Sequence, residues 1–241
     1  MLIAEAVLLL ALDDDKGTLD SGVWMQIDST IGGALLLDLA LRGRVDITGA
    51  AEPGLSPKAD SVKAGRVVIR NAAPTGDSDL DAALERLAKV DGEKPDAAVP
   101  VAAKGARDAL IQRLVAAGVL SESKRKVLGL FPKTSWPAAD DGPEAELRTR
   151  ISAVLDEGEQ PDQFTGCVIV LLQSAQILSV VFPTKDKGLR KSREARAKKL
   201  AAVQGAGEWA VGATGAAVQA TMAAMAATVA ITAATTVIVT N

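Results

Sequence analysis

IGGALLLDLALRGRV, residues 31–45, is the stretch on which the fold depends. Its first eleven residues carry almost no polar side chain, so a helix formed by them has almost no polar face. A soluble helix that is apolar nearly all round belongs in the middle of a bundle. Arg42, Gly43 and Arg44 then end it, because cations are favourable at a helix C-terminus and glycine readily closes one. We therefore predict a buried central helix.

The segments around this helix predict a mainly α protein. Apolar spacing indicates further helices at residues 1–12, 79–89, 101–118, 143–157 and 161–181. Alternating residues at 45–48 and 65–70 predict two strands paired as an antiparallel hairpin, and a charged turn between apolar runs at 119–132 predicts a second hairpin. The expected architecture is a globular helical bundle around a central hydrophobic helix, with short β-hairpins at the periphery.

The chain divides by composition near residue 208. Residues 1–208 are expected to form the globular domain, and residues 209–241 form an uncharged extension rich in Ala, Thr and Val. The extension is long enough to cross a bilayer. It contains few Leu, Ile or Phe residues, however, so its insertion energy per residue is small. A packed C-terminal helix with an apolar tail is the favoured interpretation.

Composition also restricts the function. The 241 residues include no histidine and one cysteine, and the formal net charge is −3. Without histidine the chain lacks the commonest general base and metal ligand, and Ser-His-Asp or Cys-His catalysis is impossible. A single cysteine fits a reducing compartment. We expect a non-enzymatic protein of the cytoplasm with no cofactor and no metal site.

One segment departs from this acidic balance. Residues 185–199 hold eight lysines or arginines against two carboxylates, a net charge of +6. Such segregation favours an anionic partner surface, although a solvated helix face gives the same pattern. The residues expected to face a membrane are Arg190, Lys191, Arg193 and Arg196.

A smaller basic pair stands in the predicted helix 101–118. Lys104 and Arg107 are three residues apart, so both are expected to project from one face of the first turns. The ordinary interpretation of such a pair is a solvated surface. Trp24, ahead of the central helix, is more often a core residue than a ligand contact.

Several segments together resemble one family. GGALLLDLALRGRV (32–45), NAAPTGDSDLDAALERL (71–87), RDALIQRLVAAGVL (107–120) and LGLFP (128–132), in this order, are similar to the Golgi phosphoprotein 3 family. The resemblance runs from about Leu2 to Trp209. The family includes many actinobacterial proteins, and the alanine-rich composition suits that group.

The resemblance implies a helical domain that binds phosphatidylinositol 4-phosphate on membranes and a protruding hairpin that serves self-association. The implied headgroup pocket uses a tryptophan, an arginine before the central helix, and two basic residues on a later helix. In this sequence the basic pair falls on Lys104 and Arg107. The arginine position falls on Gly32, and the tryptophan position falls on Val23, beside Trp24.

We therefore expect a peripheral membrane protein of the inner membrane face that binds anionic phospholipid headgroups. Lys104, Arg107 and Trp24 would hold the headgroup, and the hairpin tip, Leu128, Leu130 and Phe131, would add apolar contact. Peripheral binding needs two such weak signals together. Two alternatives stay open: an adaptor that binds acidic tails of membrane enzymes, and a winged-helix-like nucleic-acid binder, which the net charge disfavours.

Overall fold

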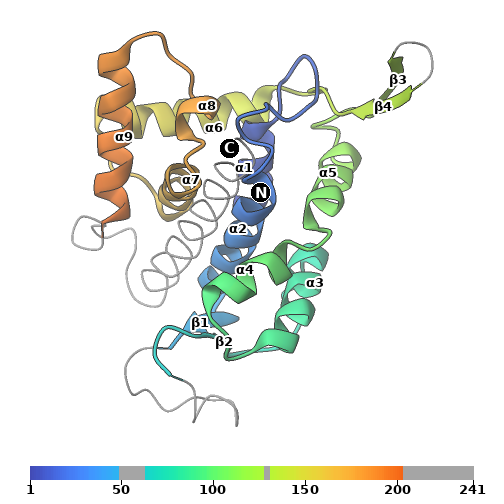
Figure 1. Cartoon of the computed structure of the whole chain (residues 1–241), viewed down its shortest axis with the longest axis vertical. Helices are drawn as coiled ribbons and strands as arrows, with labels where there is room; N and C mark the ends of the chain where they lie inside the picture. Colours follow the sequence, from blue (N-terminus) through green and yellow to red (C-terminus); the bar gives the residue numbers. More distant parts are fainter. Residues whose placement is uncertain (49–62, 128–130, 203–241) are drawn as a thin grey trace, which may run out of the picture.

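The computed structural model describes residues 1–48, 63–127 and 131–202. Within these ranges helices predominate (Figure 1). In chain order they are α1 (Ile3–Ala11), α2 (Ile27–Leu41), α3 (Ser78–Leu87), η2 (Ala88–Val90), α4 (Pro95–Ala103), α5 (Ala106–Ala116), α6 (Gly142–Ser152), η3 (Ala153–Glu157), α7 (Gln163–Ser174), α8 (Leu178–Val181) and α9 (Lys187–Ala201). The prediction of a mainly α fold with short hairpins is confirmed.

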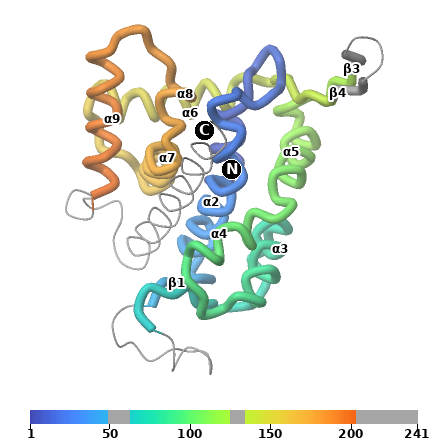
Figure 2. The backbone as a smooth tube through the Cα atoms, in the orientation of Figure 1, coloured from blue at the N-terminus to red at the C-terminus, as the bar shows by residue number. Residues whose placement is uncertain are grey.

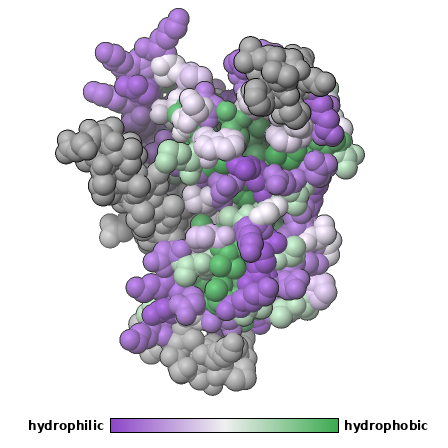
Figure 3. Space-filling view, turned by 45° about the vertical axis from the view of Figure 1, so that its right-hand side comes forward, coloured by the Kyte–Doolittle hydropathy of each residue, from purple (hydrophilic) through white to green (hydrophobic). Residues whose placement is uncertain are grey.

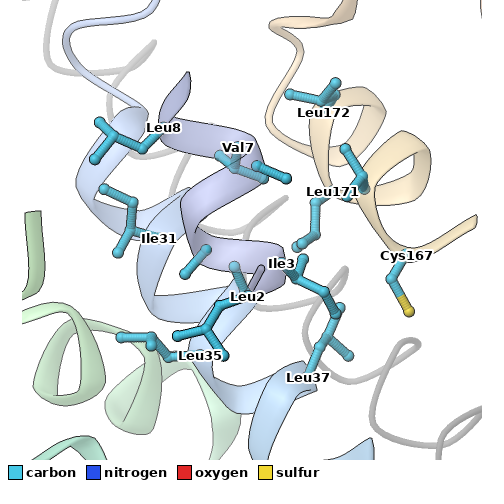
Figure 4. Close-up of a cluster of buried hydrophobic side chains, with 14 of the residues drawn as sticks. Leu2, Ile3, Val7, Leu8, Ile31, Leu35, Leu37, Cys167, Leu171 and Leu172 are labelled. Carbon is cyan, nitrogen blue, oxygen red and sulfur yellow. The ribbon is translucent and has the colours of Figure 1, made fainter. Parts of the chain in front are cut away.

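Helix α2 occupies the centre of the bundle, as the apolar stretch predicts. It packs against α1, α4 and α7, and it is buried along nearly its whole length. Every residue of α1 is also buried. In Figure 4 the side chains of Val7, Ile31 and Leu171 extend from α1, α2 and α7 into one apolar cluster. The core is therefore a contact of three helices that are apolar nearly all round.

One polar group in this core fixes α1 on α2. The carboxylate of Asp38 accepts hydrogen bonds from the backbone N–H groups of Ile3 (3.1 Å) and Ala4 (3.3 Å). These N–H groups open α1 and have no partner within that helix. Burial raises the pKa of Asp38 to about 6. A side chain of α2 thus caps α1 and sets where the two helices meet.

Two small antiparallel hairpins lie at the periphery. Strand β1 (Val45–Ile47) pairs with β2 (Val67–Ile69), Val45 opposite Ile69. Strand β3 (Ser123–Val127) pairs with β4 (Phe131–Ser135). The predicted presence of both hairpins is confirmed, but the charged residues expected to form the turn of the second one lie in strand β3. Leu128 and Leu130 of the predicted tip lie outside the described residues.

Two segments predicted as single helices are each interrupted. Residues 101–118 belong to α4 and α5, which Gly105 separates at φ +72°. Residues 161–181 belong to α7 and α8, separated near Gln176, whose φ is +59°. A positive φ cannot continue a right-handed helix, and glycine adopts it without strain. The break at Gly105 decides the geometry of the site described below.

The helices divide into two groups around α1 and α2. Helices α3 and α5 lie on one side in the backbone view, and α7 and α9 lie on the other, while α4 overlaps α2, against which it packs (Figure 2). Helix α9 packs on α7, α8 and η3. None of the described helices is both long enough and apolar enough to cross a bilayer. The extension predicted for residues 209–241 lies outside the described ranges.

Candidate functional site

A cavity of about 680 Å³ lies where α4 ends and α5 begins. The start of α2 and the end of α3 complete its walls. Four cations and two carboxylates line it, which leaves a net charge of +2 on the wall: Arg86, Lys89, Lys104, Arg107, Asp28 and Asp108. The predicted basic pair, Lys104 and Arg107, is among these residues.

The break between α4 and α5 directs the basic pair to this cavity. Lys104 follows the last residue of α4, and Gly105 turns the chain. Arg107 then lies in the first turn of α5. The prediction that both residues project from one face of a single helix is therefore wrong. Lys104 follows α4 and Arg107 lies in α5. Both reach the same cavity because the chain turns at Gly105.

Arg107 also brings Trp24 to the site. The Arg107 guanidinium lies over the Trp24 ring, 5.1 Å from its centroid, and its Nη1 is 3.3 Å from Oδ1 of Asp28. The Trp24 ring is 60% exposed, whereas the neighbouring Val23 is buried. An aromatic side chain at position 23 would point into the core. Trp24, one residue later, presents its ring beside the cavity instead.

Gly32, the position where the resemblance implies an arginine, holds the helices in close contact. A Cβ atom added there would lie 2.3 Å from the carbonyl oxygen of Val99 and 3.0 Å from the Cβ of Ala103. Such distances are below van der Waals contact, so α4 can approach α2 only because this residue is glycine. An arginine does not fit here in the present packing of the two helices.

Sequence reasoning missed two cations of the cavity, Arg86 and Lys89. Arg86 lies at the end of α3 and Lys89 lies in η2, and both are distant in sequence from Lys104. Nη2 of Arg86 donates to the carbonyl oxygen of Ala102, 2.9 Å away, near the end of α4. Arg86 and Lys89 reach the cavity because α3 packs on α4, and no local pattern in the sequence indicates that packing.

The basic segment predicted to face a membrane forms α9, and its four named cations separate into two pairs. Arg193 binds both carboxylate oxygens of Asp156, each at 2.7 Å, and the two side chains are 15% and 25% exposed. Arg196 donates to the carbonyl oxygens of Gly158 and Glu159. Arg190 and Lys191 are exposed. Arg193 and Arg196 therefore attach α9 to the segment after α6, and the outward positive charge lies on the other pair.

The remaining predicted residues are those expected at the tip of the second hairpin. Phe131 begins β4, and Leu128 and Leu130 lie outside the described residues. In Figure 1 this hairpin and α9 extend from opposite sides of the molecule. The basic helix and the hairpin therefore do not form one continuous patch.

Two buried titratable groups with raised pKa values, Cys167 and Glu144, are not among the residues that line the cavity. Burial raises the pKa of the Cys167 thiol to about 12 and that of Glu144 to about 7. Cys167 lies in α7, and Glu144 pairs with Arg148 in α6. In the described ranges no three potential metal ligands gather together. What the cavity offers chemically is positive charge beside an exposed aromatic ring.

When the side that carries α3 and α5 is turned forward, hydrophilic residues cover most of it, with small hydrophobic areas between them (Figure 3). Trp24 and Met25, both 60% exposed, add two large apolar groups next to the cations. Cations beside exposed apolar groups are typical of interfacial binding.

The comparison with known proteins agrees with the motifs in the sequence. The family model for Golgi phosphoprotein 3 (GPP34) matches residues 3–221, which is most of the chain. The matched region includes the central helix, every element that lines the cavity, and both hairpins. On this match the chain belongs to the Golgi phosphoprotein 3 family.

Proposed function

We propose that this protein binds the cytoplasmic face of anionic membranes and receives a phosphoinositide headgroup of the phosphatidylinositol 4-phosphate type in the cavity between α4 and α5. One observation carries the proposal: Lys104 and Arg107 line one cavity, and the Arg107 guanidinium lies over the exposed Trp24 ring. Family membership supports it. The function is one of binding and requires no catalytic group.

The chemistry of the wall suits a phosphate group. Lysine offers a mobile ammonium and arginine a planar set of N–H donors, and both bind phosphate oxygens through charge-assisted hydrogen bonds. Arg107 lies in the first turn of α5, where unpaired backbone N–H groups also favour an anion. Asp28, 59% exposed, neutralises part of the Arg107 charge until an anion replaces it.

The exposed apolar pair supplies the second signal that peripheral binding needs. Tryptophan is favoured at the level of lipid headgroups because its ring is amphipathic. Trp24 and Met25 lie beside the cations, so a bilayer that presents a headgroup to the cavity can also contact both side chains. Each cation near an anionic leaflet adds about 1 kcal/mol.

Vesicle co-sedimentation tests the proposal directly. The full chain is expected to pellet with vesicles that contain phosphatidylinositol 4-phosphate and to stay in solution with neutral phosphatidylcholine vesicles. Lys104→Ala and Arg107→Ala should each weaken binding about tenfold, because each removes a charge-assisted phosphate contact. Arg150→Ala is the matched control, since Arg150 is a half-exposed arginine of α6 outside the cavity. Equal pelleting with neutral and anionic vesicles at low salt would end the proposal.

A second candidate, an adaptor for acidic protein tails, is favoured by α9. Arg190 and Lys191 are exposed there, on a helix that does not reach the cavity. A pull-down with an acidic peptide should lose the protein when both residues are changed to Ala, with vesicle binding unchanged. Capture that survives this change would exclude Arg190 and Lys191 as the docking residues.

A further inference from the structure

Arg86, in the wall of the cavity, has a buried hydrogen-bond donor without a partner among the described residues. Its guanidinium makes one hydrogen bond, to the carbonyl of Ala102, and its Nε atom is buried without a hydrogen-bond partner in the described structure. Arg44 and Arg196 also have a buried Nε without a partner. Of these three arginines, Arg86 is the one whose side chain lines the cavity.

The charge of Arg86 is not neutralised by an ion pair among the described residues. Asp79 and Glu85 are the carboxylates whose charges act on it, and Asp79 already binds Arg113 at 3.1 Å. Burial lowers the pKa of Arg86 below its ordinary value, which shows that desolvation opposes its charge. A half-buried guanidinium without a carboxylate partner is unfavourable unless an anion approaches it.

Arg86 is also more enclosed than Lys104 and Trp24, and it is half-buried like Arg107. Lys104 is exposed and Trp24 is 60% exposed, whereas Arg86 is half-buried between α3 and the end of α4. A phosphate that contacts Arg86 therefore lies in a less exposed part of the cavity than one that contacts Lys104 alone. A phosphomonoester at the far end of a headgroup can reach that part, but the phosphodiester next to the glycerol is held at the bilayer surface.

We propose that Arg86 is a binding residue of the cavity that contacts a terminal phosphomonoester, so that the site distinguishes singly esterified from doubly esterified phosphate. This inference rests on the proposed headgroup function. The charges of the cavity wall and of the ligand are complementary. The wall carries a net +2, and a phosphomonoester carries about −1.5 to −2 near neutral pH. The guanidinium has donor N–H groups beyond the one that binds the carbonyl of Ala102, and its planar shape suits two parallel hydrogen bonds with phosphate oxygens.

The test compares vesicles of phosphatidylcholine that contain either phosphatidylinositol 4-phosphate or phosphatidylinositol, which differ by the terminal phosphate. Arg86→Met keeps much of the aliphatic stem and removes the charge. It should lower affinity for the first vesicle about ten- to hundredfold and leave affinity for the second unchanged. Arg86→Lys should recover part of the loss, because it restores the charge but not the planar donors. Arg150→Met, the control, should change neither affinity.

The outcomes separate the two claims. If the unaltered chain binds both vesicles equally, the headgroup function fails, and this inference fails with it. If the unaltered chain prefers phosphatidylinositol 4-phosphate and Arg86→Met keeps that preference, the role of Arg86 alone is overturned. An equal fall on both vesicles in Arg86→Met and Arg86→Lys also overturns it, because it indicates a structural role. Inorganic phosphate should compete only weakly; competition at the affinity of the lipid would identify a site for the free anion instead.

Discussion

The guanidinium of Arg107 lies over the ring of Trp24, 5.1 Å from the ring centroid, although the two residues are far apart in the sequence. The same guanidinium is 3.3 Å from Oδ1 of Asp28, so the long side chain is held in one orientation at the cavity. A side chain that is already ordered loses less entropy when a ligand binds. The contact therefore prepares Arg107 for an anion and at the same time keeps the Trp24 ring at the surface.

Replacing Trp24 should impair membrane binding without destabilising the protein. The exposed cation–π contact contributes about 0.5–1 kcal/mol, so Trp24→Ala should change the free energy of unfolding by no more than about 1 kcal/mol. Its affinity for anionic vesicles should fall severalfold to about tenfold, and Trp24→Phe should recover part of the loss because it keeps an aromatic face. Urea denaturation and co-sedimentation measure the two quantities. Equal vesicle binding by all three proteins would show that the ring plays no part.

The ion pair of Arg193 with Asp156 should be a stability feature. Both side chains are partly shielded from solvent by this contact, so removing either partner leaves the other charge without its counter-ion. Arg193→Ala and Asp156→Ala should each lower the free energy of unfolding by about 1–3 kcal/mol, and the double variant should lose less than the sum. Arg190→Ala, an exposed neighbour on the same helix, should stay within about 0.5 kcal/mol. Identical denaturation curves for Arg190→Ala and Arg193→Ala would contradict this account.

Local patterns in the sequence predict much of the fold. The all-round apolar stretch predicts α2, and alternation predicts the pairing of β1 with β2, because both signals depend on neighbouring residues. The break between α4 and α5 was missed, since a single glycine in an alanine-rich run is compatible with a continuous helix. Whether Gly105 takes a positive φ depends on how α4 packs against α2 and α3, and that is a property of the folded chain.

The site was less predictable than the fold for the same reason. Lys104, Arg107 and Trp24 were named from the sequence, but their meeting depends on a turn that was not predicted. Arg86 joins them through the contact of α3 with α4. Arg193 looked like part of a basic surface because its partner Asp156 is distant in sequence. Composition alone does not show which cations are neutralised inside the fold.

The buried carboxyl of Asp38 should make stability depend on pH. Burial raises its pKa from 3.8 to about 6, so the folded protein holds this proton more tightly than the unfolded chain does. The free energy of unfolding should therefore fall by up to about 3 kcal/mol as the pH rises from about 4 to about 6. Glu144, whose pKa is raised to about 7, acts in the same direction and extends the fall toward pH 7.

The Asp38→Asn variant shows how much of the pH dependence of the free energy of unfolding comes from Asp38. The amide does not ionise, so the part of the pH dependence due to Asp38 should disappear in urea denaturation between pH 4 and pH 6. Absolute stability changes too, because one of the two acceptors for the N–H groups of Ile3 and Ala4 becomes a donor. Asp28→Asn, at an exposed position of the same helix, is the control. If the slope is the same in Asp38→Asn as in the unaltered protein, Asp38 is not its source.

Substitution of Gly32 tests how the packing of the core affects the cavity. In Gly32→Ala the new Cβ would lie 2.3 Å from the Val99 carbonyl oxygen, and that backbone atom cannot move unless α4 moves. The free energy of unfolding should fall by about 1–3 kcal/mol or more. In Gly142→Ala, the control, the nearest atom is Oδ1 of Asp140 at 3.1 Å, which a small rotation relieves, so stability should hardly change.

The same substitution should weaken headgroup binding, since α4 leads directly to Lys104 at the cavity. Gly32→Arg, which introduces the arginine that the family pattern places here, is the sharper experiment. If an additional cation were all that mattered, this variant would bind phosphatidylinositol 4-phosphate vesicles more tightly. The packing predicts the reverse: the arginine displaces α4, stability falls further than in Gly32→Ala, and affinity declines. A stable Gly32→Arg protein with tighter binding would show that α2 and α4 can separate without disturbing the cavity.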